Sequence, residues 1–407
     1  MNKQDIIRFL DEIENDLIQD YKNEEKIALF NQKKVLDEFR KNNVAVRHFS
    51  ATEGYGYDDI GRDTLCKVYA GVFGTESAIV SPNIVSGTHA LTLAMFGVLR
   101  PNDTLLCICG EPYDTLHDTI QGKNIGSLND FGVKYEKIDL NNGKIDLIAL
   151  KNYLNCNKAR LVYIQRSRGY ELRDALSIED IENACKIVKQ LSPESIIMTD
   201  NCYGEFIDEK EPTQVGCDLV VGSLIKNIGG GLAPTGGYIA GKQEYVDLIA
   251  NRLTSPSIGM EVGSYATGYR LFYQGLFMAP HVVLQAKKAA MLFAAAFDKL
   301  GYEVLPKPRS HPNDIICSIK FNDKEKLIKF CQNIQYCSPI DSNVTPFAWD
   351  MPGYADQVIM AAGCFVGGAS IEMSCDSPIR PPYVAYLQGA LTYEHAKIAL
   401  MQILESL

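Results

Sequence analysis

Apolar residues recur every three or four positions over the first forty residues and then give way to short apolar runs. Ile6, Leu10, Ile13 and Leu17 follow this spacing, which predicts a helix over residues 4–41. Beyond residue 50, apolar segments alternate with helical patterns, and several segments are apolar on both faces. We expect a parallel or mixed sheet covered by helices. Its predicted strands are 76–82, 103–109, 133–140, 159–165, 195–200 and 218–223.

The last third of the chain follows a long alanine-rich segment. Residues 281–301 have a helical apolar pattern that ends at a glycine, as helices often do. We expect this helix to lead into a smaller α+β unit. The predicted fold class is therefore α/β, with three parts: a helical arm (1–50) packed on the body or on another subunit, a large α/β domain (51–295) and a small C-terminal α+β domain (296–407).

Composition favours a small molecule as the main partner. The 407 residues include 40 basic and 50 acidic side chains, a net charge of −10 without a basic block, so we expect no nucleic acid and no membrane partner. The N-terminus is charged throughout, and the longest uncharged stretch, 358–371, is too short to cross a bilayer. The 12 cysteines form no C-x-x-C pair, which predicts a cytoplasmic protein with reduced thiols and no metal site.

One lysine stands in apolar surroundings. In "SLIKNIGGG" (223–231), Lys226 lies between apolar residues and a glycine run. Burial favours the neutral amine, which can attack a carbonyl compound. Asp200 ends the predicted strand 195–200, and open α/β sheets bind ligands beyond the carboxyl ends of their strands. An aspartate there is also an ordinary way to begin a turn.

Other positions are candidates for ligand contacts. Ser86, Gly87 and Thr88 precede an apolar helix, where free N–H groups and the helix dipole favour a phosphate, although Ser86 also suits an ordinary helix cap. Tyr113 follows a predicted strand and suits either stacking on a planar ring or plain packing. Arg380, framed by prolines, matches a carboxylate or lies on the surface.

A phosphate site, an aromatic ring, a carboxylate and a reactive lysine are together what pyridoxal 5′-phosphate (PLP) requires. Their order resembles the fold-type-I PLP enzymes of cysteine and methionine metabolism, which have the aspartate aminotransferase fold. The resemblance is strongest to the methionine gamma-lyase-like or aluminium-resistance (cystathionine beta-lyase-like) family. The blocks that carry it are "GYGYDDIGRDTL" (54–65), "SGTHAL" (86–91), "IQRSRGY" (164–170), "SLIKNIGGG" and "PIRPPY" around Arg380.

The resemblance implies a role for each residue of the cofactor site. Lys226 would form a Schiff base with the aldehyde of PLP, Asp200 would pair with the pyridine nitrogen, and Tyr113 would stack on the ring. The phosphate would be bound by small residues from two loops: Ser86, Gly87, Thr88 and Ser223. Tyr57 and Arg62 would reach the phosphate of a neighbouring subunit. The resemblance therefore implies a homodimer at least, and we expect a homotetramer.

Two parts of the expected site depart from the better-known lyases. Ile225 stands where they have a threonine, so one phosphate hydrogen bond must come from elsewhere. "QRSRGY" replaces their asparagine-proline motif, so either Gln165 or Arg168 is expected to contact the phenolic oxygen of the cofactor. Arg380 would bind the carboxylate of the substrate, and Arg168 is a second candidate for substrate binding.

The implied activity is cleavage of a carbon–sulfur bond in an amino acid. Lys226 would remove the Cα proton and Tyr113 or Lys226 would protonate the leaving group, giving a thiol, ammonia and a 2-oxo acid. Cystathionine, methionine, cysteine and a non-sulfur amino acid are all compatible with these residues, as are β- and γ-elimination. A non-catalytic role in metal tolerance is the alternative on the same fold.

Two motifs suggest other classes of protein. Ser223 and Lys226 fit the S-x-x-K motif of penicillin-binding hydrolases, but the sequence lacks the accompanying S-D-N and K-T-G. "GGYIAGK" (236–242) nearly fits a phosphate loop, but Gln243 replaces the required Ser or Thr and the segment has the pattern of a strand. We therefore expect neither a serine hydrolase nor an NTPase.

Overall fold

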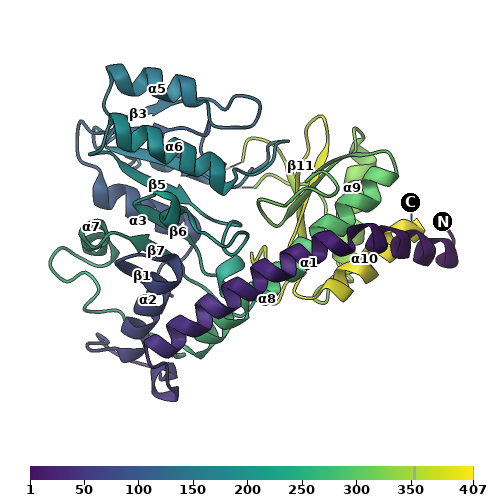
Figure 1. Ribbon diagram of the computed structural model, residues 1–407, viewed down its shortest axis with the longest axis horizontal. Helices are drawn as coiled ribbons and strands as arrows, with labels where there is room; N and C mark the ends of the chain where they lie inside the picture. Colours follow the sequence, from purple (N-terminus) through teal and green to yellow (C-terminus); the bar gives the residue numbers. More distant parts are fainter. Residues whose placement is uncertain (352–353, 407) are drawn as a thin grey trace.

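The architecture is built on two β-sheets joined by long helices. A computed structural model describes residues 1–351 and 354–406 (Figure 1). The sheet at the left of Figure 1 has seven strands, and the second sheet, at the right, has five. This arrangement confirms the predicted mixed α/β class. The division into three domains stays a prediction, because helix α8 (Arg270–Lys299) continues through the proposed boundary at residue 295.

The seven-stranded sheet has the order β1-β7-β6-β5-β4-β2-β3. The pairs among β2 to β6 are parallel, and β7 is antiparallel to both β6 and β1. Every residue of β4 to β7 is buried, which explains their continuous apolar character. The structure confirms all the predicted strands: β1 (Ser77–Ser81), β2 (Thr104–Cys107), β3 (Lys134–Lys137), β4 (Leu161–Gln165), β5 (Ile196–Asp200), β6 (Leu219–Ser223) and β7 (Gly237–Gly241).

Helices and 3-10 turns connect these strands. The side chains of Asp59, Asp146 and Ser177 each accept backbone N–H groups at a helix start and so fix where that helix begins. Two helices, α3 and α4, follow strands β1 and β2 and begin near the same edge of the sheet. The elements are η1 (Val46–Phe49), α2 (Ile60–Phe73), α3 (Gly87–Val98), α4 (Asp114–Gln121), α5 (Leu147–Cys156), α6 (Ile178–Leu191), η2 (Pro212–Val215), η3 (Asn227–Gly229) and α7 (Gln243–Leu253).

The second sheet is antiparallel, with the order β10-β11-β12-β9-β8. Its strands and the C-terminal half of α8 share one apolar core with three further helices, the N-terminal one and two that belong to this region. Asp376 of β11 is paired with Tyr386 of β12, so their side chains emerge on the same face. The elements are β8 (Glu303–Leu305), β9 (Ile316–Lys320), α9 (Lys324–Tyr336), β10 (Val358–Ala361), β11 (Ser374–Pro378), β12 (Val384–Gln388) and α10 (Tyr393–Ser406).

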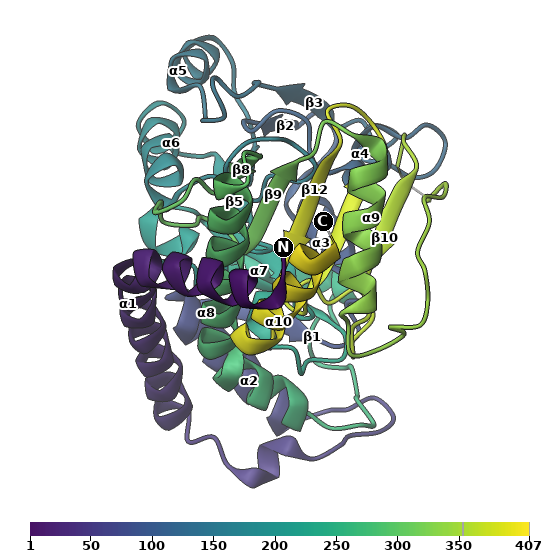
Figure 2. The ribbon, with the colours of Figure 1, turned by 90° about the vertical axis from the view of Figure 1, so that its right-hand side faces the viewer.

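The N-terminal arm is one long helix, α1 (Lys3–Lys41), as its periodicity predicts. Figures 1 and 2 show α1 lying along the body of the protein, beside α8 and α10. Ile6, Leu10 and Ile13 are fully buried in the core that α8 and the second sheet share. Glu24 of α1 and Lys287 of α8 form a buried ion pair farther along. The arm therefore packs on the body of its own chain.

The long alanine-rich helix begins earlier than predicted. The predicted start at residue 281 follows Pro280, yet α8 starts at Arg270 and runs through this proline. An interior proline costs about 3 kcal/mol because it removes one hydrogen bond and crowds the preceding turn. Phe272, Tyr273 and Leu276 are buried before the proline, as Val283 is after it. This continuous buried face offsets the cost and keeps the two segments in one helix.

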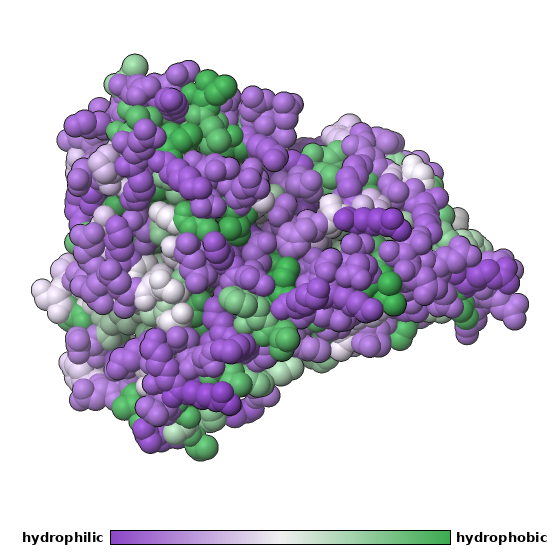
Figure 3. Space-filling model, viewed as in Figure 1, coloured by the Kyte–Doolittle hydropathy of each residue, from purple (hydrophilic) through white to green (hydrophobic). Residues whose placement is uncertain are grey.

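Polar side chains dominate the face of the molecule seen in Figure 3, and apolar residues appear there in separate patches. Within residues 1–351 and 354–406, none of the helices combines the length and the apolar character that a membrane span needs.

Candidate active site

A cavity of about 250 Å³ opens between the seven-stranded sheet and the second sheet. It lies beyond the carboxyl ends of β5 and β6, where a parallel sheet is expected to bind ligands. From the predicted site it brings together seven residues on the large-sheet side: Ser86, Gly87, Thr88, Tyr113, Asp200, Ser223 and Lys226. The other wall comes mainly from the second sheet and its loops, and includes Gly368, Asp376, Tyr386 and Gln388.

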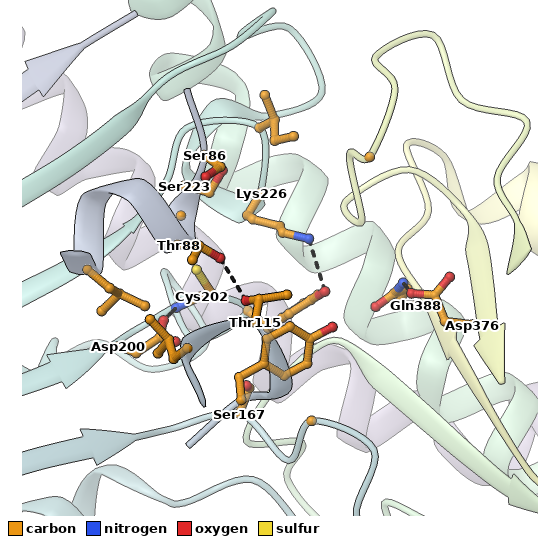
Figure 4. Close-up of a pocket in the computed structure, with 18 of the residues that line it drawn as sticks. Ser86, Thr88, Thr115, Ser167, Asp200, Cys202, Ser223, Lys226, Asp376 and Gln388 are labelled. Atoms are coloured by element: carbon orange, nitrogen blue, oxygen red, sulfur yellow. Dashed lines mark hydrogen bonds between the residues drawn. The ribbon is translucent and has the colours of Figure 1, made fainter. Parts of the chain in front are cut away.

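Lys226 follows β6 and directs its amine into the cavity (Figure 4). The amine donates a hydrogen bond to Tyr203 Oη at 3.0 Å and another to Ser370 Oγ. Burial lowers the pKa of Lys226, but the phenol of Tyr203, Cys202 and the carboxylate of Asp376 outweigh burial and raise this pKa above its ordinary value. This direction is opposite to the neutral amine that the sequence predicts, because the groups around the amine favour the ammonium.

Asp200 is the last residue of β5, and its side chain is buried. Its Oδ1 accepts a hydrogen bond from the backbone N–H of Cys202 at 3.0 Å. Burial raises the pKa of Asp200, while the Cys202 hydrogen bonds and the Lys226 ammonium act in the opposite direction. Among the described residues, no Lys, Arg or His forms an ion pair with Asp200. A buried carboxylate without an ion-pair partner favours the binding of a cationic ligand group.

The N-terminus of α3 forms one end of the cavity. Ser86 Oγ accepts the N–H of His89 at 3.1 Å, so Ser86 is the helix cap. Gly87 and Thr88 occupy the first turn, where an α-helix has N–H groups without partners in the helix. A Cβ on Gly87 would lie 3.4 Å from the side chains of both Cys202 and Ser223, so a larger residue would narrow the cavity. Figure 4 shows Ser86, Thr88 and Ser223 gathered on one side of Lys226. This end suits a phosphate.

Tyr113 lines the cavity between the helix end and the second sheet. Its backbone N–H donates to Gln165 Oε1 at 2.7 Å, and its hydroxyl lies 2.7 Å from that of Tyr354. Burial raises the pKa of Tyr113 well above its ordinary value, so the phenol keeps its proton. Gln165 is itself buried and does not line the cavity. It positions Tyr113, and the expectation that it contacts the cofactor directly has no support in this geometry.

Arg168 lies outside the cavity wall as well. Its side chain is 1% exposed and binds both carboxylate oxygens of Asp314, at 3.0 and 2.8 Å, and Ser318 Oγ at 3.2 Å. Because Asp314 and Ser318 belong to the second-sheet region, Arg168 ties the loop after β4 to that sheet. Its donors are occupied, and it does not line the cavity. The prediction that Arg168 contacts substrate or cofactor is therefore not supported.

Three other predicted residues lie outside the cavity wall. Arg380 is exposed, and its guanidinium binds Asp356 Oδ2 at 2.9 Å. Tyr57 is 63% exposed. Arg62 is buried and donates to the carbonyls of Gly56 and Gly263. None of the three contacts the cavity of its own chain, so their predicted roles stay predictions.

Four polar residues of this region carry no recognisable signal in the sequence: Tyr203, Ser370, Asp376 and Gln388. Tyr203 comes three residues after Asp200 but belongs to a segment that has the pattern of an ordinary turn. The other three come from the C-terminal part of the chain, and Ser370 follows Lys226 by 144 residues. Only the packing of the second sheet against the first brings them to Lys226.

The two alternative motifs do not form the sites that they suggest. An S-x-x-K nucleophile requires a hydrogen bond between the serine and the lysine. Within the described chain the amine of Lys226 binds Tyr203 and Ser370 and has no hydrogen bond to Ser223. The glycine-rich segment before Gln243 is strand β7, buried in the sheet, and Lys242 binds Asp218 at 2.8 Å. The structure therefore confirms the strand and provides no phosphate loop there.

Known proteins share this architecture. Residues 6–407 match the family model described as methionine gamma-lyase. The uncharacterized protein YnbB of Bacillus subtilis is 50% identical over 400 residues, which cover 97% of this chain and 95% of the relative. L-methionine gamma-lyase of Pseudomonas putida is 28% identical over 200 residues, which cover 48% of this chain and 45% of the relative.

Solved structures are similar to this chain over nearly its whole length. A carbon-sulfur lyase involved in aluminium resistance from Clostridium novyi NT is 50% identical, with a TM-score of 0.95 and coverage of 99% of this chain and 96% of that chain. A proposed cystathionine beta-lyase involved in aluminium resistance from Clostridium acetobutylicum is also 50% identical, with a TM-score of 0.95 and coverage of 98% and 94%. These relatives support a carbon–sulfur lyase kind of chemistry, and their family implies PLP. The chain belongs to the methionine gamma-lyase family.

Proposed function

We propose that this chain is a PLP-dependent carbon–sulfur lyase of fold type I that acts on a sulfur-containing amino acid of the cystathionine or methionine type. One observation carries the proposal: Lys226, Asp200 and the N-terminus of α3 line the same cavity. These are the groups that an aldehyde, a pyridine nitrogen and a phosphate require. The family and the names of the relatives support this chemistry.

The residues fit PLP at each of its polar ends. Gly87, Thr88 and Ser223 would bind the phosphate at the helix terminus. Asp200, a buried carboxylate that forms no ion pair with another described residue, would bind the protonated ring nitrogen. Thr115 also lines the cavity, with its hydroxyl 2.8 Å from that of Thr88. It is a candidate for the phosphate hydrogen bond that Ile225 cannot make.

The chemistry then follows from the residues around Lys226. Bound PLP would withdraw electrons from the α-carbon of the substrate. Lys226 would move the Cα proton, because its amine is held at a fixed place by the hydroxyls of Tyr203 and Ser370. Tyr113 keeps its phenolic proton and is paired with Tyr354, so it is the candidate that protonates a thiol leaving group. The products would be a thiol, ammonia and a 2-oxo acid.

We also propose a homodimer at least, with a homotetramer as the expected assembly. Tyr55 and Tyr57 are 72% and 63% exposed in a segment before α2, and their ring centres lie 5.6 Å apart. Exposed aromatic residues of this kind are typical of protein interfaces. In the proposed assembly Tyr57 and Arg62 would approach the phosphate of the neighbouring subunit.

Release of a 2-oxo acid tests the proposed function. The purified protein with PLP would be incubated with cystathionine, methionine, cysteine and a non-sulfur amino acid, and pyruvate, 2-oxobutyrate and thiol would be measured. We expect release from at least one sulfur amino acid, and no release by Lys226→Ala. Tight binding of PLP without any release would contradict the lyase and favour a non-catalytic protein on the same fold.

A further inference from the structure

Asp376 is a second carboxylate in the cavity, distinct from Asp200. It lies on β11, and its Oδ2 accepts a hydrogen bond from Gln388 Nε2 at 3.0 Å. Its Oδ1 is buried and has no hydrogen-bond donor among the described residues. A buried acceptor without a partner costs about 1–3 kcal/mol. A ligand that supplies a donor at Oδ1 would recover this free energy.

The position of Asp376 assigns it to the substrate. Figure 4 shows Asp376 and Gln388 on one side of Lys226 and Ser86, Thr88 and Ser223 on the opposite side. If the phosphate lies at α3, the cofactor occupies the side of Ser86, Thr88 and Ser223. The space beside Asp376 is then left for the side chain of the amino acid that reacts at Lys226.

The charges around the cavity favour a cation beside Asp376. Among the described residues that line it, Lys226 is the one cation, and Asp200 and Asp376 are both carboxylates. The hydrogen bonds of the Lys226 amine go to hydroxyl groups and not to Asp376. Once the cofactor occupies Lys226 and Asp200, Asp376 is the acidic group that is left without a cation among the described residues that line the cavity. A carboxylate group of the substrate would be repelled there, whereas an ammonium would be attracted.

Aromatic rings complete a site for an ammonium group. Tyr113, Tyr170 and Tyr386 line the cavity, and the ring centres of Tyr170 and Tyr386 lie 5.4 Å apart. Burial raises the pKa of the Tyr170 phenol, and the nearby carboxylate of Asp376 raises it further. Faces of aromatic rings attract ammonium groups, and a carboxylate beside them adds a charged hydrogen bond.

We propose that Asp376 binds a second ammonium group on the side chain of the substrate, so that the preferred substrates are amino acids with two amino groups. This inference rests on the proposed function, because it takes Lys226 as the reacting end. It makes a thioether amino acid with a second ammonium, and no second carboxylate, on its side chain a better substrate than methionine, and Asp376 the residue that distinguishes the two.

Binding of unreactive amino acids to the PLP-loaded protein tests the inference without turnover. L-Ornithine and L-norleucine differ by an ammonium in place of a methyl group, as do L-lysine and L-2-aminoheptanoate. Calorimetry should give at least tenfold tighter binding of the diamino acid in one of these pairs. Asp376→Asn should reduce the ratio to within about threefold. Asp118→Asn, which removes an exposed charge outside the cavity, should leave the ratio unchanged.

Two results would overturn the inference: equal binding within both pairs by the wild-type protein, or a preference that survives Asp376→Asn. If Asp376 acted as a proton donor instead, its substitution would slow elimination from mono- and diamino acids alike and would not change the binding ratio. The 2-oxo acid assay is independent of this measurement. A protein that prefers diamino acids but releases no 2-oxo acid would retain the Asp376 site and lose the proposed lyase activity.

Discussion

The amine of Lys226 lies 3.0 Å from the phenolic oxygen of Tyr203 and 4.7 Å from the centre of the same ring. Tyr203 has a φ of +70°, a left-handed conformation that is rare for an aromatic residue. Backbone strain of this kind persists only where the surrounding structure imposes it, and it is frequent at active sites. We infer that the strained turn after β5 holds the phenol against the amine.

Replacement of Tyr203 by phenylalanine should lower the pKa of Lys226, because the phenolic oxygen is a principal group that raises it. A neutral amine attacks an aldehyde, so the rate of PLP binding should rise with pH, and its midpoint should move to lower pH in Tyr203→Phe. Stopped-flow absorbance across a pH series measures this midpoint. Tyr386→Phe is the control, since that hydroxyl donates to Tyr170 O and not to Lys226. An unchanged midpoint in Tyr203→Phe would argue against the assigned role.

Gln165 should act through Tyr113. Gln165→Met removes the acceptor of the Tyr113 N–H, which should cost about 1–3 kcal/mol of unfolding free energy and weaken PLP binding as the ring shifts. Urea unfolding and equilibrium titration with PLP measure the two effects. Gln274→Met, an exposed change on α8, should alter neither. Weaker PLP binding without loss of stability would instead favour a direct contact between Gln165 and the cofactor.

The ion pair of Arg168 and Asp314 should matter for stability. Both side chains are 1% exposed. Arg168→Met leaves a buried carboxylate without its partner, which should lower the free energy of unfolding by about 3–5 kcal/mol. The double variant Arg168→Met with Asp314→Leu should recover most of this loss, since no unpaired charge remains. A higher KM with unchanged unfolding would restore Arg168 as a substrate residue.

Glu205 should make the protein less stable as pH rises. Burial, followed by smaller effects from Glu211 and Asp200, raises the pKa of Glu205 from 4.5 to about 8. Between these values the folded state keeps a proton that the unfolded state releases, so the unfolding free energy falls as pH increases through this range. Glu205→Gln should remove this part of the pH dependence, whereas the exposed change Glu194→Gln should retain it. Equal slopes for wild type and Glu205→Gln in urea unfolding would contradict the assigned pKa.

The strands and the arm could be predicted because their signals are local. Runs such as Leu161–Gln165 are buried on both faces, and the spacing of Ile6, Leu10 and Ile13 fixes one face of α1. The start of α8 could not be read in the same way. Local rules end a helix at Pro280, and the packing that overrides them involves residues far apart in the sequence.

The same distinction applies to the site. Asp200, Ser223 and Lys226 lie at strand ends of a single sheet, so their convergence follows from the topology. Asp376 and Gln388 reach the cavity only because the second sheet faces the first, and no short motif records that contact. Arg168 shows the converse: an arginine within a specific motif has its donors occupied by Asp314, a partner 146 residues away.

Covalent attachment of PLP to the protein would show whether Lys226 is the residue that forms the Schiff base. The protein would be incubated with PLP, reduced with borohydride and digested, and the modified peptide would be identified by mass spectrometry. We expect a single pyridoxyl group on the Lys226 side chain, lost in Lys226→Ala and kept in Lys242→Ala. Attachment to another lysine as the main product, or no attachment, would contradict this expectation.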